Sequence, residues 1–353
     1  MRAIQKTKPG AGLEVVDVPK PTIGSADVLI RVKHAGVCGT DLHIAEWDEW
    51  AQSRIKPPLV LGHEFAGVIE EVGEDVSAFT VGDVVTAEGH IICGHCRQCR
   101  TGNGHICANT SIIGVDRAGA FADWISMPAS NVMTLDGIPT EIGAIMDPMG
   151  NAFHTVLHGT EVPGSMVLVV GCGPIGCFAV GIAKAAGASA VIASDVNPRR
   201  LALAKAMGAD VLVRADTQDV VAEVMQATGN EGADLVCEMS GHPVALAQAF
   251  KACRLGGRVN LLGLPKGEVK LNLSNDVIFR GLTVYGVIGR RMYETWHQMR
   301  TFLSASRPDG QAARTAMFDP RPVITHTFPL EKINDALEAI RSGQAGKVIL
   351  EIA

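Results

Sequence analysis

Four cysteines that lie close together constrain the fold of this chain more than any other feature of its sequence. Cys93, Cys96, Cys99 and Cys107 have the spacing C-x2-C-x2-C-x7-C, with polar residues and glycine between them. Short loops of this kind can place four thiolates around one tetrahedral ion, and zinc is the metal that such a set favours. Four sulfur ligands leave no position for water, so the predicted site is structural and the chemistry must lie elsewhere.

Three other interpretations of the cysteine cluster are less favoured. Disulfides need an oxidising compartment, and the chain starts without a secretory signal, so we expect a cytoplasmic protein with reduced thiols. An iron–sulfur cluster also takes four cysteines, but the spacing does not match the patterns expected for one. A nucleic-acid-binding zinc module would need basic surroundings, whereas this chain has a formal net charge of -6 and scattered basic residues. We expect no nucleic acid and no membrane as partners.

An uncharged stretch at 166–183 is long enough to raise the question of a membrane helix. Its start is rich in valine, and glycines and Pro174 interrupt its middle, so it predicts a buried strand, a glycine turn and an apolar helix. The composition, 47% hydrophobic and 19% charged over 353 residues, is that of a globular chain with room for two domains.

The spacing pattern of apolar residues changes near residue 150. Before it, short β-branched runs such as 27–33 and 65–72 are separated by turns, which predicts a small β barrel or sandwich. After it, strand-like runs alternate with helix-like runs, as where a strand at 167–170 precedes an apolar helix. That alternation predicts an α/β domain with a doubly wound parallel sheet.

The last segment of the chain departs from this alternation. It predicts a helix at 330–340 and a strand at 347–352. We expect it to return and pack on the first domain, so that residues 1–150 and 294–353 form one domain and residues 151–293 form the other.

A glycine motif follows the predicted strand at 167–170. Gly171, Gly173 and Gly176 fit G-x-G-x-x-G, and the motif opens a predicted helix, which is the context that a dinucleotide fingerprint requires. The first glycine makes the tight turn, the second lets the backbone approach a pyrophosphate, and the third lets helix and strand pack closely. The N-terminus of the helix offers free N–H groups to the phosphates.

Asp195 ends the next predicted strand, about 20 residues after the motif. A carboxylate there can accept hydrogen bonds from the adenosine ribose and repel a 2′-phosphate, which favours NAD over NADP. Arg199 and Arg200 follow closely and weaken this discrimination. The alternative is an ordinary strand-end aspartate that caps the next helix.

Two short segments before the cysteine cluster supply candidates for an open metal site. One contains Cys38, Thr40 and His43, and the other contains His63 and Glu64. Cysteine, histidine and glutamate are zinc ligands, and three protein ligands leave a position for water or substrate. Each segment alone is more often structural. Their combination with a four-thiolate loop and a complete dinucleotide fingerprint favours a metal-dependent oxidoreductase.

Together these motifs make the chain similar to the medium-chain zinc-dependent alcohol dehydrogenase family over essentially its whole length. The resemblance implies a GroES-like, β-rich catalytic domain and a Rossmann cofactor domain. It implies NAD and two zinc ions per chain, a catalytic ion held by Cys38 and His63 with Glu64 as a close or alternating ligand, and a structural ion held by the four clustered cysteines. It also implies a homotetramer.

Several segments are most similar to the branch of this family that oxidises L-threonine; they are 38–50, 88–90, 147–154, 238–241 and 341–349. The resemblance implies a proton relay at Thr40 and His43 and a carboxylate near the zinc at Asp147. The implied NAD contacts include the fingerprint glycines and Ile175, Asp195, Arg200, Leu262, Gly263, Leu264, Val287 and Ile288.

The implied reaction is oxidation of the secondary alcohol of L-threonine to L-2-amino-3-oxobutanoate, with zinc as the Lewis acid. The segment 47–50 and His90 are candidates for contacts with the substrate's ammonium and carboxylate groups. Polyol dehydrogenases of this family tend to have Glu-Pro where this chain has Asp147-Pro148, and the shorter aspartate favours action through water. Two alternatives remain open: a zinc-dependent polyol or diol dehydrogenase of the sorbitol or butanediol type, and a non-enzymatic NAD-binding zinc protein.

Overall fold

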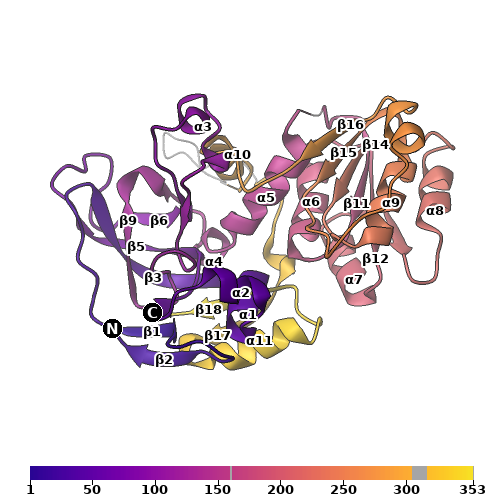
Figure 1. Cartoon of the computed structure of the whole chain (residues 1–353). Helices are drawn as coiled ribbons and strands as arrows, with labels where there is room; N and C mark the ends of the chain where they lie inside the picture. Colours follow the sequence, from indigo (N-terminus) through magenta and orange to yellow (C-terminus); the bar gives the residue numbers. More distant parts are fainter. Residues whose placement is uncertain (160, 304–315, 353) are drawn as a thin grey trace. The chain divides into compact units, whose positions relative to one another are not determined.

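The computed structural model describes residues 1–159, 161–303 and 316–352 (Figure 1). Its described residues fall into two compact units, a first unit of 1–147, 291–303 and 324–352 and a second unit of 148–290 and 316–323. The boundaries that the sequence predicts, 1–150 with 294–353 against 151–293, remain a proposal for the domain limits. The segment 316–323 goes with the second unit because the Phe318 ring lies over Gly181 and 6.4 Å from the ring of Phe153.

The first unit is built around a long central strand, β3, which spans Asp27–Val37. It belongs to a seven-stranded sheet with the order β10-β6-β5-β3-β18-β17, and β9 also pairs with β3. The other strands of this sheet are β5 (Glu64–Val72), β6 (Val84–Ala87), β9 (Trp124–Pro128), β10 (Val132–Thr134), β17 (Ile324–Pro329) and β18 (Lys347–Glu351). A second sheet has the order β2-β1-β4, with β1 at Arg2–Lys6, β2 at Glu14–Asp17 and β4 at Leu59–Val60.

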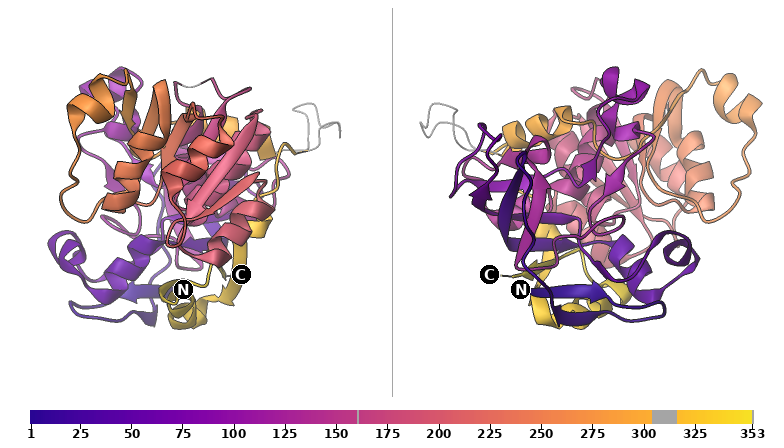
Figure 2. Two further views of the ribbon diagram at one scale, coloured as in Figure 1. Left: turned by 90° about the vertical axis from the view of Figure 1, so that its right-hand side faces the viewer. Right: turned by 60° about the vertical axis from the view of Figure 1, so that its left-hand side comes forward.

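The C-terminal segment packs on the first unit. Strand β18 pairs antiparallel with β3, placing Val348 opposite Val37, and helix α11 (Ile333–Arg341) buries Ile333, Ala336 and Leu337. The two ends of the chain lie side by side (Figures 1 and 2), and the Arg2 guanidinium donates to the carbonyl of Ile352 at 2.9 Å.

The short helices of the first unit carry several functional candidates. They are α1 (Gly39–Glu46), α2 (Glu49–Arg54), α3 (Arg97–Arg100), α4 (Thr140–Gly143) and α10 (Glu294–Leu303). Two further short strands, β7 (His90–Ile91) and β8 (Ser111–Ile112), pair with each other and flank the loop that holds the clustered cysteines. Helix α5 (Met146–Leu157) begins in the first unit and continues into the second.

The second unit has a six-stranded parallel sheet with the order β13-β12-β11-β14-β15-β16, which confirms the predicted doubly wound fold. The strands are β11 (Met166–Val170), β12 (Ala190–Asp195), β13 (Val211–Arg214), β14 (Ala233–Glu238), β15 (Cys253–Leu261) and β16 (Thr283–Gly286). The helices are α6 (Pro174–Ala185), α7 (Pro198–Ala206), α8 (Val220–Ala227) and α9 (Pro243–Ala252). The stretch 166–183 is thus strand β11, a glycine turn and most of α6, and no described helix is long and apolar enough to cross a bilayer.

The order in which the chain adds strands to the sheet reverses between β11 and β14. The chain runs outward through β12 and β13, with α6 and α7 on one face, and then crosses to β14, β15 and β16, with α8 and α9 on the other (Figures 1 and 2). Ligands of open α/β sheets bind beyond the carboxyl ends of the strands at such a reversal. The glycine motif follows β11 directly and therefore lies at this point.

A buried hydrogen bond ties helix α10 to the loop after β6 within the first unit. The side chains of Trp296 and Glu88 are fully buried, and Trp296 Nε1 donates to Glu88 Oε2 at 2.8 Å. Oε1 of Glu88 accepts from the backbone N–H of His90 at 2.9 Å. A carboxylate in this position is costly to bury without such donors.

We expect Trp296→Phe to destabilise the protein because it removes the indole donor while keeping most of the apolar volume. A hydrogen bond to a charged group contributes about 1.5–3 kcal/mol, so the midpoint of thermal unfolding should fall by several degrees. Calorimetry measures this, with Trp50→Phe as the control because Trp50 is 43% exposed. Equal midpoints for the two variants would show that the Trp296–Glu88 bond contributes little.

Candidate active site

The first donor of the candidate metal site lies where the central strand ends. Strand β3 stops at Val37, and Cys38 is the N-cap of α1. The backbone N–H of Cys38 donates to Oδ2 of Asp41 at 2.9 Å, which forms half of a capping box. The distance from Cys38 Sγ to Thr40 Oγ1 is 3.7 Å. The local sequence Cys-Gly-Thr-Asp therefore places the sulfur and the first hydroxyl of the predicted relay in one helical turn.

The second and third donors come from the turn that leads into β5. Gly62 has φ +93°, and a Cβ there would overlap the ring of Phe121, so only glycine fits. This turn delivers His63 and Glu64 beside Cys38. One ligand atom from each of Cys38, His63 and Glu64 lies within 4.8 Å of the other two.

Buried polar atoms without a hydrogen-bond partner gather around these donors. Among the described residues they include Asp41 Oδ1, His63 Nδ1 and Glu64 Oε1. Burial opposes a charged imidazole, yet the nearby Asp41 and Cys38 raise the pKa of His63 to about 10. Surroundings that stabilise a cation on the ring also attract a metal cation. The three donors fit a zinc ion with an open coordination position.

Lys347 forms an ion pair with Glu64 that the sequence analysis missed. Its Nζ lies 2.5 Å from Glu64 Oε2 and donates to the carbonyl of Val37 at 2.9 Å, and both side chains are buried, with 4% and 1% of their surface exposed. Burial lowers the pKa of Lys347, but Glu64 and Cys38 outweigh it and raise the pKa. The only available signal was a lone charge at the start of the apolar strand 347–352.

The remaining predicted catalytic residues lie outside the metal-binding group. His43 lies on the same face of α1 as Thr40, since residues three apart share a face, and its Nδ1 is 2.6 Å from Asp48 Oδ2. Asp147 is buried near the start of α5. It is not among the three donors whose ligand atoms lie within 4.8 Å of one another.

The four clustered cysteines form a second group of donors. All are free thiols, and the sulfur–sulfur distances are 3.4 Å for Cys96–Cys99, 3.5 Å for Cys93–Cys107 and 3.9 Å for Cys96–Cys107. Four zinc–sulfur bonds of about 2.3 Å place the sulfurs at the corners of a tetrahedron about 3.8 Å apart. The cluster therefore fits a closed, structural zinc site, and a disulfide would need about 2.05 Å.

Backbone amides support the charge of these sulfurs. The N–H groups of Cys93 and Asn109 donate to Cys107 Sγ at 3.5 and 3.3 Å. Those of His95 and Cys96 lower the pKa of Cys93 to about 6. Thiolates are the form that binds metal, so these amides favour ligation by Cys93, whereas burial and the neighbouring Cys96 raise the pKa of Cys99 to about 12.

The glycine motif has the close approaches that its pattern predicts. Gly171 has φ +91°, and a Cβ there would lie 2.9 Å from the backbone nitrogen of Ser240. A Cβ at Gly176 would overlap the carbonyl oxygen of Gly171, whereas a Cβ at Gly173 would meet no atom within 4 Å. The first and third glycines are needed for packing. The second leaves open space beside the N-terminus of α6, where a pyrophosphate can bind.

Asp195 ends β12 and is buried beside the motif. Its Oδ2 accepts from the N–H of Cys172 at 2.7 Å, and its Oδ1 accepts from the N–H of Asn197 at 2.8 Å. A carboxylate has about four lone-pair positions, so two remain for ribose hydroxyls. Arg200, on α7, has a buried Nε without a hydrogen-bond partner among the described residues.

The other predicted cofactor contacts lie at the same edge of the sheet. Ile175 is in the first turn of α6, residues 262–264 follow β15, and residues 287–288 follow β16. Gly263 is required there, because a Cβ would overlap the N–H of Gly241. The buried Glu238 carboxylate fixes this edge by accepting from the N–H groups of Ser240 and Gly241 at 2.9 and 3.0 Å.

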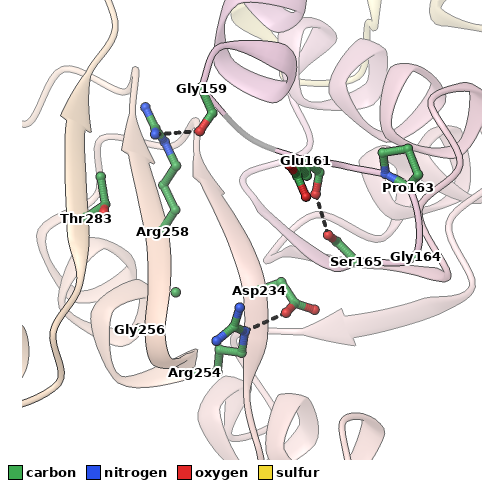
Figure 3. Close-up of a pocket in the computed structure, with 11 residues that line it drawn as sticks. Gly159, Glu161, Pro163, Gly164, Ser165, Asp234, Arg254, Gly256, Arg258 and Thr283 are labelled. Atoms are coloured by element: carbon green, nitrogen blue, oxygen red, sulfur yellow. Dashed lines mark hydrogen bonds and ion pairs between the residues drawn. The ribbon is translucent and has the colours of Figure 1, made fainter.

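A cavity of about 460 Å³ lies at the opposite, amino-terminal edge of the parallel sheet (Figure 3). Its two arginines are already engaged: Arg254 Nε donates to Asp234 at 2.5 Å, and Arg258 Nη1 donates to the carbonyl of Gly159 at 2.7 Å. None of the predicted catalytic, cofactor-binding or metal-binding residues lines this cavity. It is therefore not the candidate active site.

Comparison with known proteins agrees with these sites. A family of alcohol dehydrogenase GroES-like domains matches residues 24–137, and a family of zinc-binding dehydrogenases matches residues 174–305. The chain is 49% identical to an L-threonine 3-dehydrogenase of Bacillus subtilis over 351 residues, 99% of this chain and 98% of that protein. It is 44% identical to an L-threonine 3-dehydrogenase of Pyrococcus horikoshii over 351 residues, again 99% and 98%.

Solved structures of related enzymes share the complete fold. An alcohol dehydrogenase from Thermus sp. ATN1 matches with a TM-score of 0.89 at 29% identity over 100% of both chains. A 2R,3R-butanediol dehydrogenase from Bacillus subtilis matches with a TM-score of 0.85 at 27% identity over 99% of each chain.

The fold and the two donor groups define a zinc-binding, NAD-dependent oxidoreductase of the alcohol dehydrogenase class, which confirms the predicted fold, class and cofactors. Within that class, its full-length similarity to the Bacillus and Pyrococcus enzymes shows that the chain belongs to the L-threonine 3-dehydrogenase family.

We expect Cys99→Ser to lower the zinc content from two ions per chain to one, since three sulfurs no longer close a tetrahedron. The loss of a structural ion should lower the thermal midpoint by roughly 5–10 °C. Metal analysis and calorimetry measure both effects. His95→Ala is the control, because its exposed ring forms a hydrogen bond with the Cys93 carbonyl and is not needed as a ligand. Two bound ions and an unchanged midpoint in Cys99→Ser would contradict a structural zinc.

Lys347→Met should destabilise the metal-free protein strongly, because it leaves the Glu64 carboxylate buried without its cation. Breaking a buried pair in this way costs about 3–5 kcal/mol. Added zinc should raise the thermal midpoint of Lys347→Met more than that of the wild type, because the ion then compensates Glu64. Lys347→Arg keeps the charge and serves as the control. Equal zinc-dependent shifts in all three proteins would show that Lys347 does not balance Glu64.

Proposed function

We propose that this chain oxidises the secondary alcohol of L-threonine to L-2-amino-3-oxobutanoate, with NAD as the hydride acceptor. The observation that carries the proposal is full-length identity of 44–49% to L-threonine 3-dehydrogenases from two distant organisms. The complete set of donors at Cys38, His63 and Glu64 supports an enzyme over a non-enzymatic NAD-binding protein, because a scaffold has no need of an open metal site.

Different residues of the first unit have different roles at the metal centre. A zinc ion, when bound, supplies the Lewis acidity that makes the substrate hydroxyl easier to deprotonate. Cys38 and His63 would hold the ion, with Glu64 as a close or alternating ligand, and the Asp41 carboxylate lies 3.8 Å from His63 Nδ1 as a nearby negative charge. Lys347 partly neutralises the negative charge of Glu64 through their ion pair. Asp147 acts through water, because its shorter side chain lies outside the group of donors.

The proton of the substrate must leave a site that is closed to water during hydride transfer. Thr40 lies beside Cys38 and is the first member of the relay. His43 lies one turn further along α1 with 49% of its side chain exposed, so it can pass a proton to solvent. His90 and the segment 47–50 remain candidates for contacts with the substrate's ammonium and carboxylate groups.

The second unit provides the binding site for NAD. We propose that Gly171, Gly173 and the N-terminus of α6 bind the pyrophosphate, and that Asp195 accepts from the ribose hydroxyls. The two fixed hydrogen bonds of Asp195 hold its carboxylate where a 2′-phosphate would be repelled. The other residues of this proposed site are Ile175, Gly176, Arg200, Leu262, Gly263, Leu264, Val287 and Ile288.

A diol substrate is the second candidate. It is favoured by the structural similarity to 2R,3R-butanediol dehydrogenase, although the identity of 27% is well below that to the threonine enzymes. Asp147 in place of the glutamate typical of polyol dehydrogenases favours threonine.

We also propose that the protein is a cytoplasmic homotetramer. Strand β16 is an edge of the parallel sheet, and apolar side chains of the segment 273–288 are exposed, namely Leu273, Ile278, Phe279, Val284 and Ile288. Exposed apolar groups of this kind are typical of surfaces that associate. The described cysteines are all free, which suits a reducing compartment.

An NAD-linked assay on zinc-replete protein tests the proposed function. We expect reduction of NAD with L-threonine and much less with sorbitol or 2,3-butanediol, and a preference for NAD over NADP. His43→Ala should lower kcat by about 10²-fold or more while both zinc ions stay bound, because it removes a proton acceptor and no ligand. Activity with 2,3-butanediol but not with L-threonine would overturn the proposal. Loss of zinc from His43→Ala would overturn the assignment of His43.

A further inference from the structure

The two carboxylate oxygens of Asp48 have different partners. Asp48 lies between α1 and α2 as the N-cap of α2, and its Oδ1 accepts from the backbone N–H of Ala51 at 2.9 Å. Its Oδ2 lies 2.6 Å from Nδ1 of His43. One side chain thus begins a helix and holds the ring of the proposed relay histidine.

The chemistry of the carboxylate decides which nitrogen of His43 carries a proton. The Ala51 amide and His43 lower the pKa of Asp48, so the group is ionised and can only accept hydrogen bonds. Nδ1 must therefore be the donor in the 2.6 Å contact. In the neutral ring this leaves Nε2 with the lone pair. A distance of 2.6 Å is at the short end for a charge-assisted bond.

The backbone around Asp48 is held independently of this contact. Trp47 adopts the left-handed conformation with φ 61°, and its N–H donates to the carbonyl of His43 at 3.0 Å. The ammonium of Lys6 lies 4.9 Å from the centre of the Trp47 ring and donates to the carbonyl of Gly12 at 3.0 Å. Gln52 Nε2 donates to the carbonyl of Trp47 at 2.8 Å. Asp48 therefore meets His43 from a fixed position.

We propose that Asp48 is a positioning residue for the proton relay, which holds His43 in the tautomer whose Nε2 accepts the proton from the substrate side. This inference rests on the proposed function, because it assumes that His43 carries the proton. It also removes Asp48 from the candidate substrate contacts in the segment 47–50, since both oxygens of Asp48 already have partners.

The proton balance of the step is simple. The O–H bond of the substrate breaks, Thr40 passes a proton on, and the lone pair of Nε2 forms the new N–H bond. The resulting imidazolium lies against the Asp48 carboxylate, which stabilises its charge. The ring becomes neutral again when Nε2 loses that proton to water or to a buffer base, while Nδ1–H stays on Asp48. The electron pair of the broken C–H bond leaves with the hydride to NAD.

Asp48→Asn separates the two functions of this side chain. An asparagine oxygen can still accept from the Ala51 amide, so α2 keeps its cap. The amide nitrogen then donates to Nδ1 of His43, which forces the proton of the neutral ring onto Nε2 and blocks the acceptor. The same inversion explains why an aspartate-to-asparagine change disables a catalytic histidine in serine proteases.

The experiment has two measurements on the zinc-replete, full-length protein. Nitrogen-15 NMR of histidine-labelled protein, with the His43 signals assigned by their loss in His43→Ala, reports the tautomer. We expect Nδ1–H in the wild type and Nε2–H in Asp48→Asn. Steady-state assays with saturating NAD should show kcat for L-threonine about tenfold lower in Asp48→Asn, with KM changed less than twofold, and partial rescue by imidazole buffer.

Asp219→Asn is the matched control. Asp219 caps α8 by accepting from the N–H groups of Val221 and Ala222 at 3.0 and 3.1 Å, and it contacts no histidine among the described residues. It should leave kcat and the His43 signals unchanged.

Two outcomes would overturn the inference. The first is a wild-type His43 with its proton on Nε2. The second is an Asp48→Asn protein that keeps the wild-type kcat but raises KM for L-threonine, which would make Asp48 a substrate contact. A wild type that does not oxidise L-threonine would refute the proposed function, and the tautomer measurement would still decide the assignment of Asp48.

Discussion

The rest of the structure depends on one constraint. The buried negative charges at the candidate catalytic metal site must be balanced by positive charge. Asp41 and Glu64 are almost completely buried, and the ligand atoms of Cys38, His63 and Glu64 lie within 4.8 Å of one another. Burial is the main reason that the pKa of Asp41 is raised. Such a group is stable only with a cation at its centre, because an unpaired carboxylate in a protein interior costs several kcal/mol. Lys347 supplies one positive charge, and the donor geometry fits a zinc ion for the rest.

This requirement explains why the C-terminal segment belongs to the catalytic unit. Lys347 is the first residue of β18, and the pairing of β18 with β3 brings it to the end of the strand that leads to Cys38. The pairing of β18 with β3 therefore also places the positive charge of Lys347 beside Glu64. A chain that ended with its second domain would leave Glu64 without this partner and the central strand with an open edge.

The sequence predicted those parts of the site that local motifs encode. The four-cysteine loop and the glycine fingerprint each carry their geometry within a few residues, so their spacing predicted them. The Cys38 and His63–Glu64 segments became candidates only in combination with these two motifs. Lys347 and Glu64 could not be paired in the same way, because strand pairing across most of the chain brings them together. Asp48 was assigned to the substrate pocket because its acidity was visible in the sequence, whereas its bond to His43 depends on the turn between two helices.

The fold could likewise be predicted where it depends on local sequence, and not where it depends on contacts between distant segments. Alternating strands and helices predicted the parallel sheet well, because each β-α step is local. The membership of 316–323 in the second unit escaped prediction, since it depends on the contacts of the Phe318 ring with Phe153 and Gly181 rather than on any periodicity. Local sequence patterns thus predict helices, strands and motifs, whereas long-range packing determines the unit to which each segment belongs.

Burial separates the residues that hold the metal from those that move the proton. Glu64, Asp41 and Lys347 are excluded from water, where charges interact strongly and hold a fixed arrangement. His43 and Asp48 lie at the surface, with 49% and 38% of their side chains exposed. A proton acceptor must release its proton to solvent in every turnover, so a buried ring would trap the charge that it gains. The contact with Asp48 gives an exposed ring the orientation that buried residues obtain from packing, and it does so without closing the path to water.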